Sequence, residues 1–111
     1  MTDFSYLNVD NAYKLINQKV TKTPLVTNDY INNLLEAEIY FKLENLQNTG
    51  SFKLRGATHK IIKLIETIKD SGVVAYSSGN HAQAVAYASM INSISAKTVS
   101  YTHLRAHETD S

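Results

Sequence analysis

Two polar stretches decide how this chain folds, KLENLQNTGSFKLRGA at residues 42–57 and SSGNHAQAVAYAS at residues 77–89. Each contains a turn between a short apolar run typical of a strand and a longer run with helical spacing. Lys53 stands at the first turn, and the sequence SSGNH at 77–81 forms the second. Ligands of open parallel sheets bind at the carboxyl ends of the strands, so we expect both turns to contribute to one site.

Apolar residues between 54 and 68 recur at intervals of three and four and predict an amphipathic helix of about 15 residues. These positions are Leu54, Ala57, Ile61, Leu64 and Ile68. Gly72 supplies the stop after this helix. Residues 80–91 are rich in alanine and uncharged, which predicts a second helix, buried on more than one face.

Strands are expected at residues 39–44, 73–76 and 95–99, on either side of these two helices. The order strand, helix, strand, helix, strand predicts an α/β fold, a partial three-layer βαβαβ unit around a parallel sheet with right-handed crossovers.

The amino-terminal part is expected to hold smaller elements. Asp10 is a candidate cap for a helix whose apolar face carries Ala12, Leu15, Ile16 and Val20. The helix is expected to end before Thr23 and Pro24, because proline restricts the preceding residue to extended conformations. A short strand at 25–26 and a helix over 28–36 follow.

Size and composition exclude several classes of function. A length of 111 residues allows one domain at most, and a net charge of +1 with interspersed lysines and acids argues against a nucleic-acid partner. The chain has no cysteine, so it has no disulfide and no thiolate metal site. Residues 1–10 do not resemble a signal peptide, and no run is long enough to span a membrane. We therefore expect a cytoplasmic protein without a membrane partner.

The position of Lys53 suits covalent chemistry with a carbonyl group. A lysine amine attacks a carbonyl only in its neutral form, and the positive end of a helix dipole disfavours the ammonium. Gly50 allows the backbone to approach a flat cofactor, and Phe52 offers an aromatic ring. The alternative is a surface lysine at an ordinary helix start.

The second turn, 77–81, suits an anion. Backbone N–H groups at a helix start lack internal partners and bind carboxylates or phosphates. The alternative for Ser78 and Asn80 is simple capping of the helix.

The two quoted stretches resemble the threonine dehydratase and serine racemase family, pyridoxal-phosphate enzymes of fold type II, and the resemblance extends over residues 8–98. It implies that Lys53 forms the Schiff base with pyridoxal 5'-phosphate and removes the substrate α proton. It also implies that Phe52 packs on the cofactor ring and that Asn80 bonds its phenolic oxygen. The remaining implied residues surround the amino-acid substrate, with Ser78 as a catalytic acid/base on the opposite face: Ser77, Ser78, Gly79 and His81.

The main activity that the resemblance implies is that of an L-threonine/L-serine ammonia-lyase. The parent enzyme is expected to be a homo-oligomer. Serine racemase and 3-hydroxyaspartate dehydratase share the motifs and stay open as alternatives. A non-catalytic fragment or small-ligand binder is the alternative of another class.

The sequence departs from this family in two places. It has no run of glycines of the kind that cradles the cofactor phosphate, and no glycine after Gly79. We therefore expect the chain to be an amino-terminal fragment that is inactive alone. Residues 1–98 are interpreted as dehydratase sequence, and residues 99–111 as a non-native tail that resembles translated adaptor read-through. His103 and His107 in that tail have helical metal-ligand spacing but no third ligand, so no metal site is expected.

Overall fold

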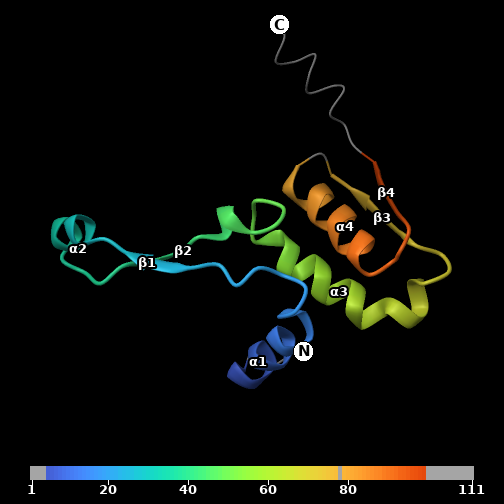
Figure 1. Cartoon of the computed structure of the whole chain (residues 1–111), viewed down its shortest axis with the longest axis horizontal. Coiled ribbons are helices and arrows are strands. Elements are labelled where there is room, and N and C mark those ends of the chain that lie inside the picture. Colours follow the sequence, from blue (N-terminus) through green and yellow to red (C-terminus); the bar gives the residue numbers. More distant parts are fainter. Residues whose placement is uncertain (1–4, 78, 100–111) are drawn as a thin grey trace, which may run out of the picture.

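The computed structural model describes residues 5–77 and 79–99 of the chain. Its helices are α1 (Tyr6–Ile16), α2 (Asp29–Leu35), α3 (Lys53–Ile68) and α4 (Asn80–Ile91), with a short 3-10 turn at Glu44–Leu46. Its strands are β1 (Leu25–Thr27), β2 (Tyr40–Lys42), β3 (Val73–Tyr76) and β4 (Ala96–Val99). Figure 1 shows α3 at the centre, with α4 and the β3–β4 pair on one side and α1 on the other. The α/β class is confirmed.

The expected cap of the first helix was wrong. The helix begins at Tyr6, because the Ser5 side chain caps it by accepting a hydrogen bond from the backbone N–H of Asn8. It ends at Ile16, so Val20 lies beyond it. Ile16 and Val20 nevertheless belong to the same buried cluster, which also holds residues of α3 and α4.

Helix α3 matches the expected range, but two of its residues differ from the prediction in burial. Leu54, Ile61 and Ile68 are buried as expected, and Thr58 is buried on the same face. Leu64 is 37% exposed, because it lies around the helix from the Leu54–Ile61 line. Gly72 ends the segment as predicted: its φ is +78°, which only glycine adopts freely, and its N–H donates to the Ile68 carbonyl at 2.7 Å.

The strands form two separate pairs instead of one three-stranded sheet. β3 and β4 are parallel, with Val73 opposite Ala96 and Tyr76 opposite Val99. The strand expected at residues 39–44 is β2, and it pairs antiparallel with β1 instead of joining β3 and β4. The Asn32 side chain holds the return of the chain after α2: its amide donates to the Thr27 hydroxyl and its oxygen accepts the Ile39 N–H, so Tyr40 comes back alongside Thr27.

Helix α4 links α3 to the parallel strands. Its buried residues, Ala84, Val85, Ala88 and Ser89, form one broad face and not several, since Met90 is 65% exposed. Small side chains on this face let α3 approach closely, and Ala84, Ala88 and Leu54 are fully buried. The α3–α4 contact is therefore the centre of the core.

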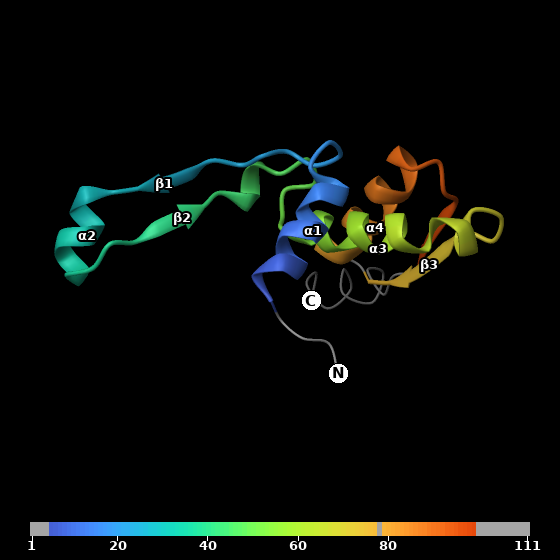
Figure 2. The same cartoon turned by 90° about the horizontal axis from the view of Figure 1, so that it is seen from below.

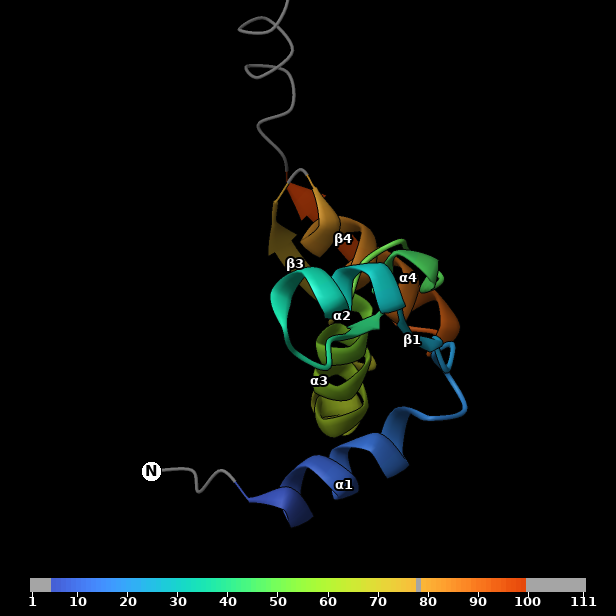
Figure 3. The ribbon, with the colours of Figure 1, turned by 90° about the vertical axis from the view of Figure 1, so that its left-hand side faces the viewer.

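The β1–α2–β2 segment projects from this core as an arm. Figure 2 shows it extending to one side of the helices, and Figure 3 looks along it, with α1 and the β3–β4 pair on opposite sides of α3. All residues of β1 and β2 are exposed. Across the described ranges, no helix is long and apolar enough to cross a membrane.

Candidate active site

Lys53 is the first residue of α3, at the end of a loop that begins at the 3-10 turn. Gly50 in that loop has φ +78°, and the Gly50 N–H donates to the Gln47 carbonyl at 2.8 Å. Phe52 precedes the helix without a side-chain cap and is 63% exposed. The loop therefore presents both the amine and the aromatic ring at the surface of the helix start.

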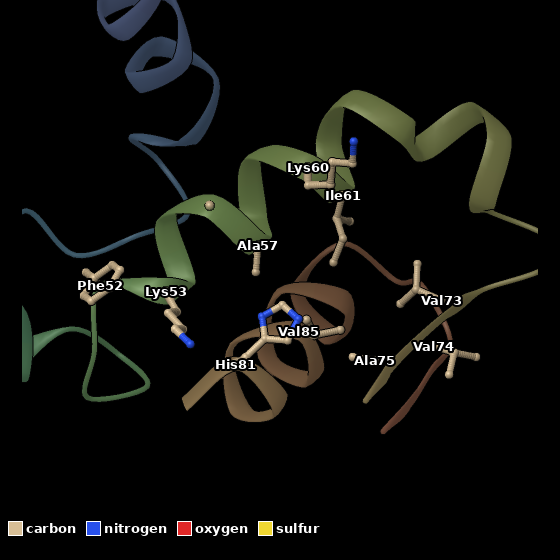
Figure 4. A pocket seen from close by; sticks show the side chains of 11 residues that line it. Phe52, Lys53, Ala57, Lys60, Ile61, Val73, Val74, Ala75, His81 and Val85 are labelled. Carbon is tan, nitrogen blue, oxygen red and sulfur yellow. The ribbon is translucent and has the colours of Figure 1, made fainter. Parts of the chain in front are cut away.

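A cavity of about 500 Å³ opens beside Lys53, where α3, β3 and α4 meet. Figure 4 shows the Lys53 side chain extending from the first turn of α3 toward the beginning of α4, where the His81 ring lies. Apolar side chains of Ile61 and Val85 line the same space. The cavity thus combines an apolar wall with the amine of Lys53, whereas the amine of Lys60, which also lines the cavity, points away from it in Figure 4.

The second predicted turn lies at the start of α4. Gly79 occupies the cap position, and no side chain of the described residues caps this helix. Its N–H donates to Ser77 Oγ at 3.3 Å. The first backbone N–H groups of α4 therefore stay available to an anion, at the end of the helix where the dipole is positive.

The cavity brings together only part of the predicted set. Phe52, Lys53 and His81 line it. Asn80 is the first residue of α4 and is exposed, next to His81 in the chain. Ser77 and Gly79 flank the turn before α4. Ser78 and the tail residues His103 and His107 lie outside the described residues.

A polar cluster that the motif interpretation missed anchors the loop before Lys53. Arg55 donates from Nε to Glu44 Oε1 at 2.6 Å and from Nη2 to Glu44 Oε2 at 3.0 Å. The Thr23 hydroxyl also donates to Glu44. Gln47, which is buried, accepts from the Thr21 N–H at 2.7 Å and donates to the Thr21 carbonyl at 3.0 Å. These five residues, named the latch below, join three segments of the chain.

The latch ion pair is more shielded from water than the other pairs of the described chain. The Arg55 and Glu44 side chains are 25% and 14% exposed, whereas those of Lys14 and Asp10 are 68% and 43% exposed. The Arg55 hydrogen bond, helped by Thr23 and Gln47, lowers the pKa of Glu44 from 4.5 to about 2 despite the opposing effect of burial. The same bond raises the pKa of Arg55. Glu44 is therefore ionised throughout the neutral range.

The sequence contains only a partial signal of the latch. Glu44 and Arg55 have opposite charges and bracket the loop of the Lys53 motif, although nothing in their spacing of eleven residues requires contact. Only the folded loop brings them together.

The described residues fit pyridoxal phosphate on two counts. Lys53 places an amine in a cavity large enough for a small aromatic ring, and no hydrogen bond or ion pair engages that amine within residues 5–77 and 79–99. The uncapped start of α4 can receive an anion. Within those ranges, no cluster of three metal-ligating side chains occurs.

A family comparison agrees with this chemistry. The model of the pyridoxal-phosphate dependent enzyme family matches residues 16–102. The chain belongs to this family, whose members depend on pyridoxal phosphate.

Individual relatives within this family have several named activities. The chain is 47% identical to a serine racemase of Dictyostelium discoideum over 85% of this chain and 29% of the relative. It is 51% identical to a biosynthetic L-threonine dehydratase of Lactococcus lactis, over 79% and 21%. It is 43% identical to an L-threo-3-hydroxyaspartate ammonia-lyase of Saccharomyces cerevisiae, over 86% and 29%. The chain therefore spans less than a third of the length of these relatives.

The solved structures agree in fold. The crystal structure of the Dictyostelium serine racemase superposes with a TM-score of 0.80 at 47% identity, over 85% of this chain and 31% of the other. The fold is that of the fold type II pyridoxal-phosphate enzymes.

Proposed function

We propose that this chain is the amino-terminal part of a pyridoxal-phosphate-dependent L-threonine/L-serine ammonia-lyase, which converts a hydroxy amino acid to a 2-oxo acid and ammonia. The observation that carries the proposal is the amine of Lys53 in a cavity shared with the start of α4. When bound, the cofactor supplies a ring that stabilises negative charge on the substrate α carbon.

Each residue then has a defined part. Lys53 holds the cofactor carbonyl and, once released by the substrate amine, takes the α proton with its Nζ. Phe52 packs on the ring, and Asn80 donates to the phenolic oxygen. Backbone N–H groups at the start of α4 bind the substrate carboxylate. Four residues surround the substrate, with Ser78 facing its opposite side: Ser77, Ser78, Gly79 and His81.

The overall reaction is balanced by water. Loss of the α proton and the β hydroxyl group removes one water from the substrate. Hydrolysis of the resulting enamine restores that water and releases ammonia, so no oxidant is needed. Serine racemisation and 3-hydroxyaspartate dehydration are the alternative outcomes, since relatives of both names match the chain. The 111 residues alone are proposed to be inactive, with residues 99–111 as a non-native tail.

The test uses the full-length parent enzyme with L-threonine and L-serine, measuring 2-oxo acid and D-isomer in the same samples. Lys53→Ala is expected to abolish both products, and Ser78→Ala to reduce the D-isomer far more than the 2-oxo acid. Lys63→Ala, which changes an exposed lysine of the same helix outside the cavity, is the control and should retain activity. D-serine forming faster than pyruvate would replace the lyase by the racemase. Full activity of Lys53→Ala would reject the whole assignment.

A further inference from the structure

The first turn of α3 has no side-chain N-cap. Phe52 precedes the helix and offers no side-chain hydrogen bond to its first N–H groups. Helix starts are normally fixed by a Ser, Thr, Asp or Asn side chain. Some other contact must therefore define where the first turn, and with it Lys53, is placed.

The latch provides that contact. Arg55 lies two residues after Lys53 in the same turn, and its guanidinium grips Glu44 through two parallel hydrogen bonds of 2.6 and 3.0 Å. Such a fork fixes orientation as well as distance, which a single ammonium cannot do.

The other end of the latch is also fixed. Glu44 accepts a hydrogen bond from the Thr23 hydroxyl, and Lys42 Nζ donates to the Thr23 carbonyl at 2.6 Å. Gln47 holds the Thr21 backbone through two hydrogen bonds, much as a neighbouring strand would. The Glu44 carboxylate that accepts from Arg55 is therefore positioned by hydrogen bonds from the segment between α1 and β1.

We propose that Arg55 is a positioning residue, which through Glu44 and the rest of the latch fixes the first turn of α3 and aims the Lys53 amine into the cavity. The proposal rests on the proposed function only in assigning a carbonyl partner to Lys53. It adds that the segment 21–23, which lies outside the cavity lining, controls the reactivity of that lysine.

The experiment compares two lysines of the same helix in the 111-residue chain. Lys53 and Lys60 both line the cavity, but only Lys53 lies in the turn that the latch holds. Pyridoxal 5'-phosphate is added, the adducts are reduced with borohydride, and the labelling of each lysine is measured by peptide mass spectrometry. The ratio of Lys53 to Lys60 labelling is unaffected by a general loss of protein, since both sites are in one molecule.

The wild-type chain is expected to label Lys53 over Lys60. Arg55→Ala and Glu44→Gln are expected to lower the ratio by about tenfold, as for loss of an oriented charge-assisted contact. Arg55→Lys should give an intermediate ratio, because it keeps the charge but not the fork. Asp10→Asn removes an exposed ion pair on α1 and should leave the ratio unchanged.

Hydrogen exchange of the backbone amides of residues 50–56 gives a readout that needs no cofactor. It should become faster in Arg55→Ala, while exchange within α4 stays as in wild type. If Arg55→Ala unfolds the chain, Thr23→Val decides the question, since it removes one hydrogen bond to Glu44 and leaves Arg55 in place. An unchanged ratio with unchanged exchange at 50–56 overturns the proposal. A wild-type chain that labels Lys53 no faster than Lys60 overturns it too, whereas inactivity of the parent enzyme with an intact ratio counts only against the proposed function.

Discussion

Glu44 is the residue whose charge state matters most to the described fold. Its carboxylate accepts from Arg55 through both oxygens and from Thr23, so three donors converge on one side chain. Charge-assisted hydrogen bonds of this kind contribute more than neutral ones, and the Glu44 side chain is only 14% exposed. The stability of the loop before Lys53 should therefore depend on pH.

The direction of this dependence follows from the pKa. Folding lowers the pKa of Glu44 from 4.5 to about 2, so the ionised group stabilises the folded chain above about pH 5, and this contribution is lost as pH falls toward 2. Glu44→Gln should cost about 1–3 kcal/mol in free energy of unfolding at pH 7. The difference from wild type should shrink steadily between about pH 5 and pH 2. Urea titrations at a series of pH values measure it.

Asp10→Asn is the matched control, because Asp10 also pairs with a basic residue but lies exposed on α1. Its effect should stay below about 0.5 kcal/mol at every pH. A Glu44→Gln difference that stays constant down to pH 2 would show that the carboxylate does not act through its charge.

At the scale of elements, the turn between α3 and β3 is the most constrained connection. Gly72 has φ +78°, and a Cβ built there would lie 2.6 Å from the Ser95 carbonyl oxygen. That oxygen also accepts the Val73 N–H at 2.9 Å, so it cannot move away without breaking the β3–β4 ladder. The Ser95 carbonyl therefore constrains both the turn after α3 and the start of β3.

Gly72→Ala should destabilise the chain by about 1–3 kcal/mol, because strain from the left-handed backbone adds to a clash with the Ser95 carbonyl. Gly56→Ala offers the opposite case within the same segment: it lies inside α3, where a Cβ meets no atom within 4 Å. Alanine there should stabilise the helix by up to about 1 kcal/mol. Chemical denaturation of both variants tests the pair, and equal effects of the same sign would contradict this account.

The elements near the site could be predicted from sequence because their signals are local. The apolar spacing from Leu54 to Ile68 and the glycine after it predicted α3 and its end, and the uncharged alanine-rich run predicted α4. The pairing of β2 could not be predicted, because it depends on hydrogen bonds of the Asn32 side chain that form only once the chain has turned back. The latch was missed for the same reason, since an ion pair between Glu44 and Arg55 exists only after the loop has folded.

On the scale of the whole molecule, the described chain is extended. Its radius of gyration is 17.5 Å, whereas a compact domain of this length would have about 13 Å. Figure 2 shows the arm projecting away from the helices, which fits an extended shape. Its large apolar side chains remain at the surface, with Leu25 61%, Tyr30 73% and Leu34 67% exposed.

We expect the arm to open far more often than the core in the isolated chain. A two-stranded ribbon is marginal in water by itself, while α4 is buried against α3 and the parallel strands. Hydrogen exchange at neutral pH should show rapid exchange in residues 25–42 and slow exchange in residues 84–89. Equal protection of both regions would mean that the arm is covered in solution, which a concentration series would then attribute to self-association or exclude.

The close approach of Gly72 to the Ser95 carbonyl also has a genetic consequence. Every amino acid other than glycine carries a Cβ, so every missense change in this codon places an atom where the neighbouring backbone already lies. In a library of random single-codon variants, position 72 should therefore retain glycine alone among the well-folded members, although glycine offers no functional group for chemistry.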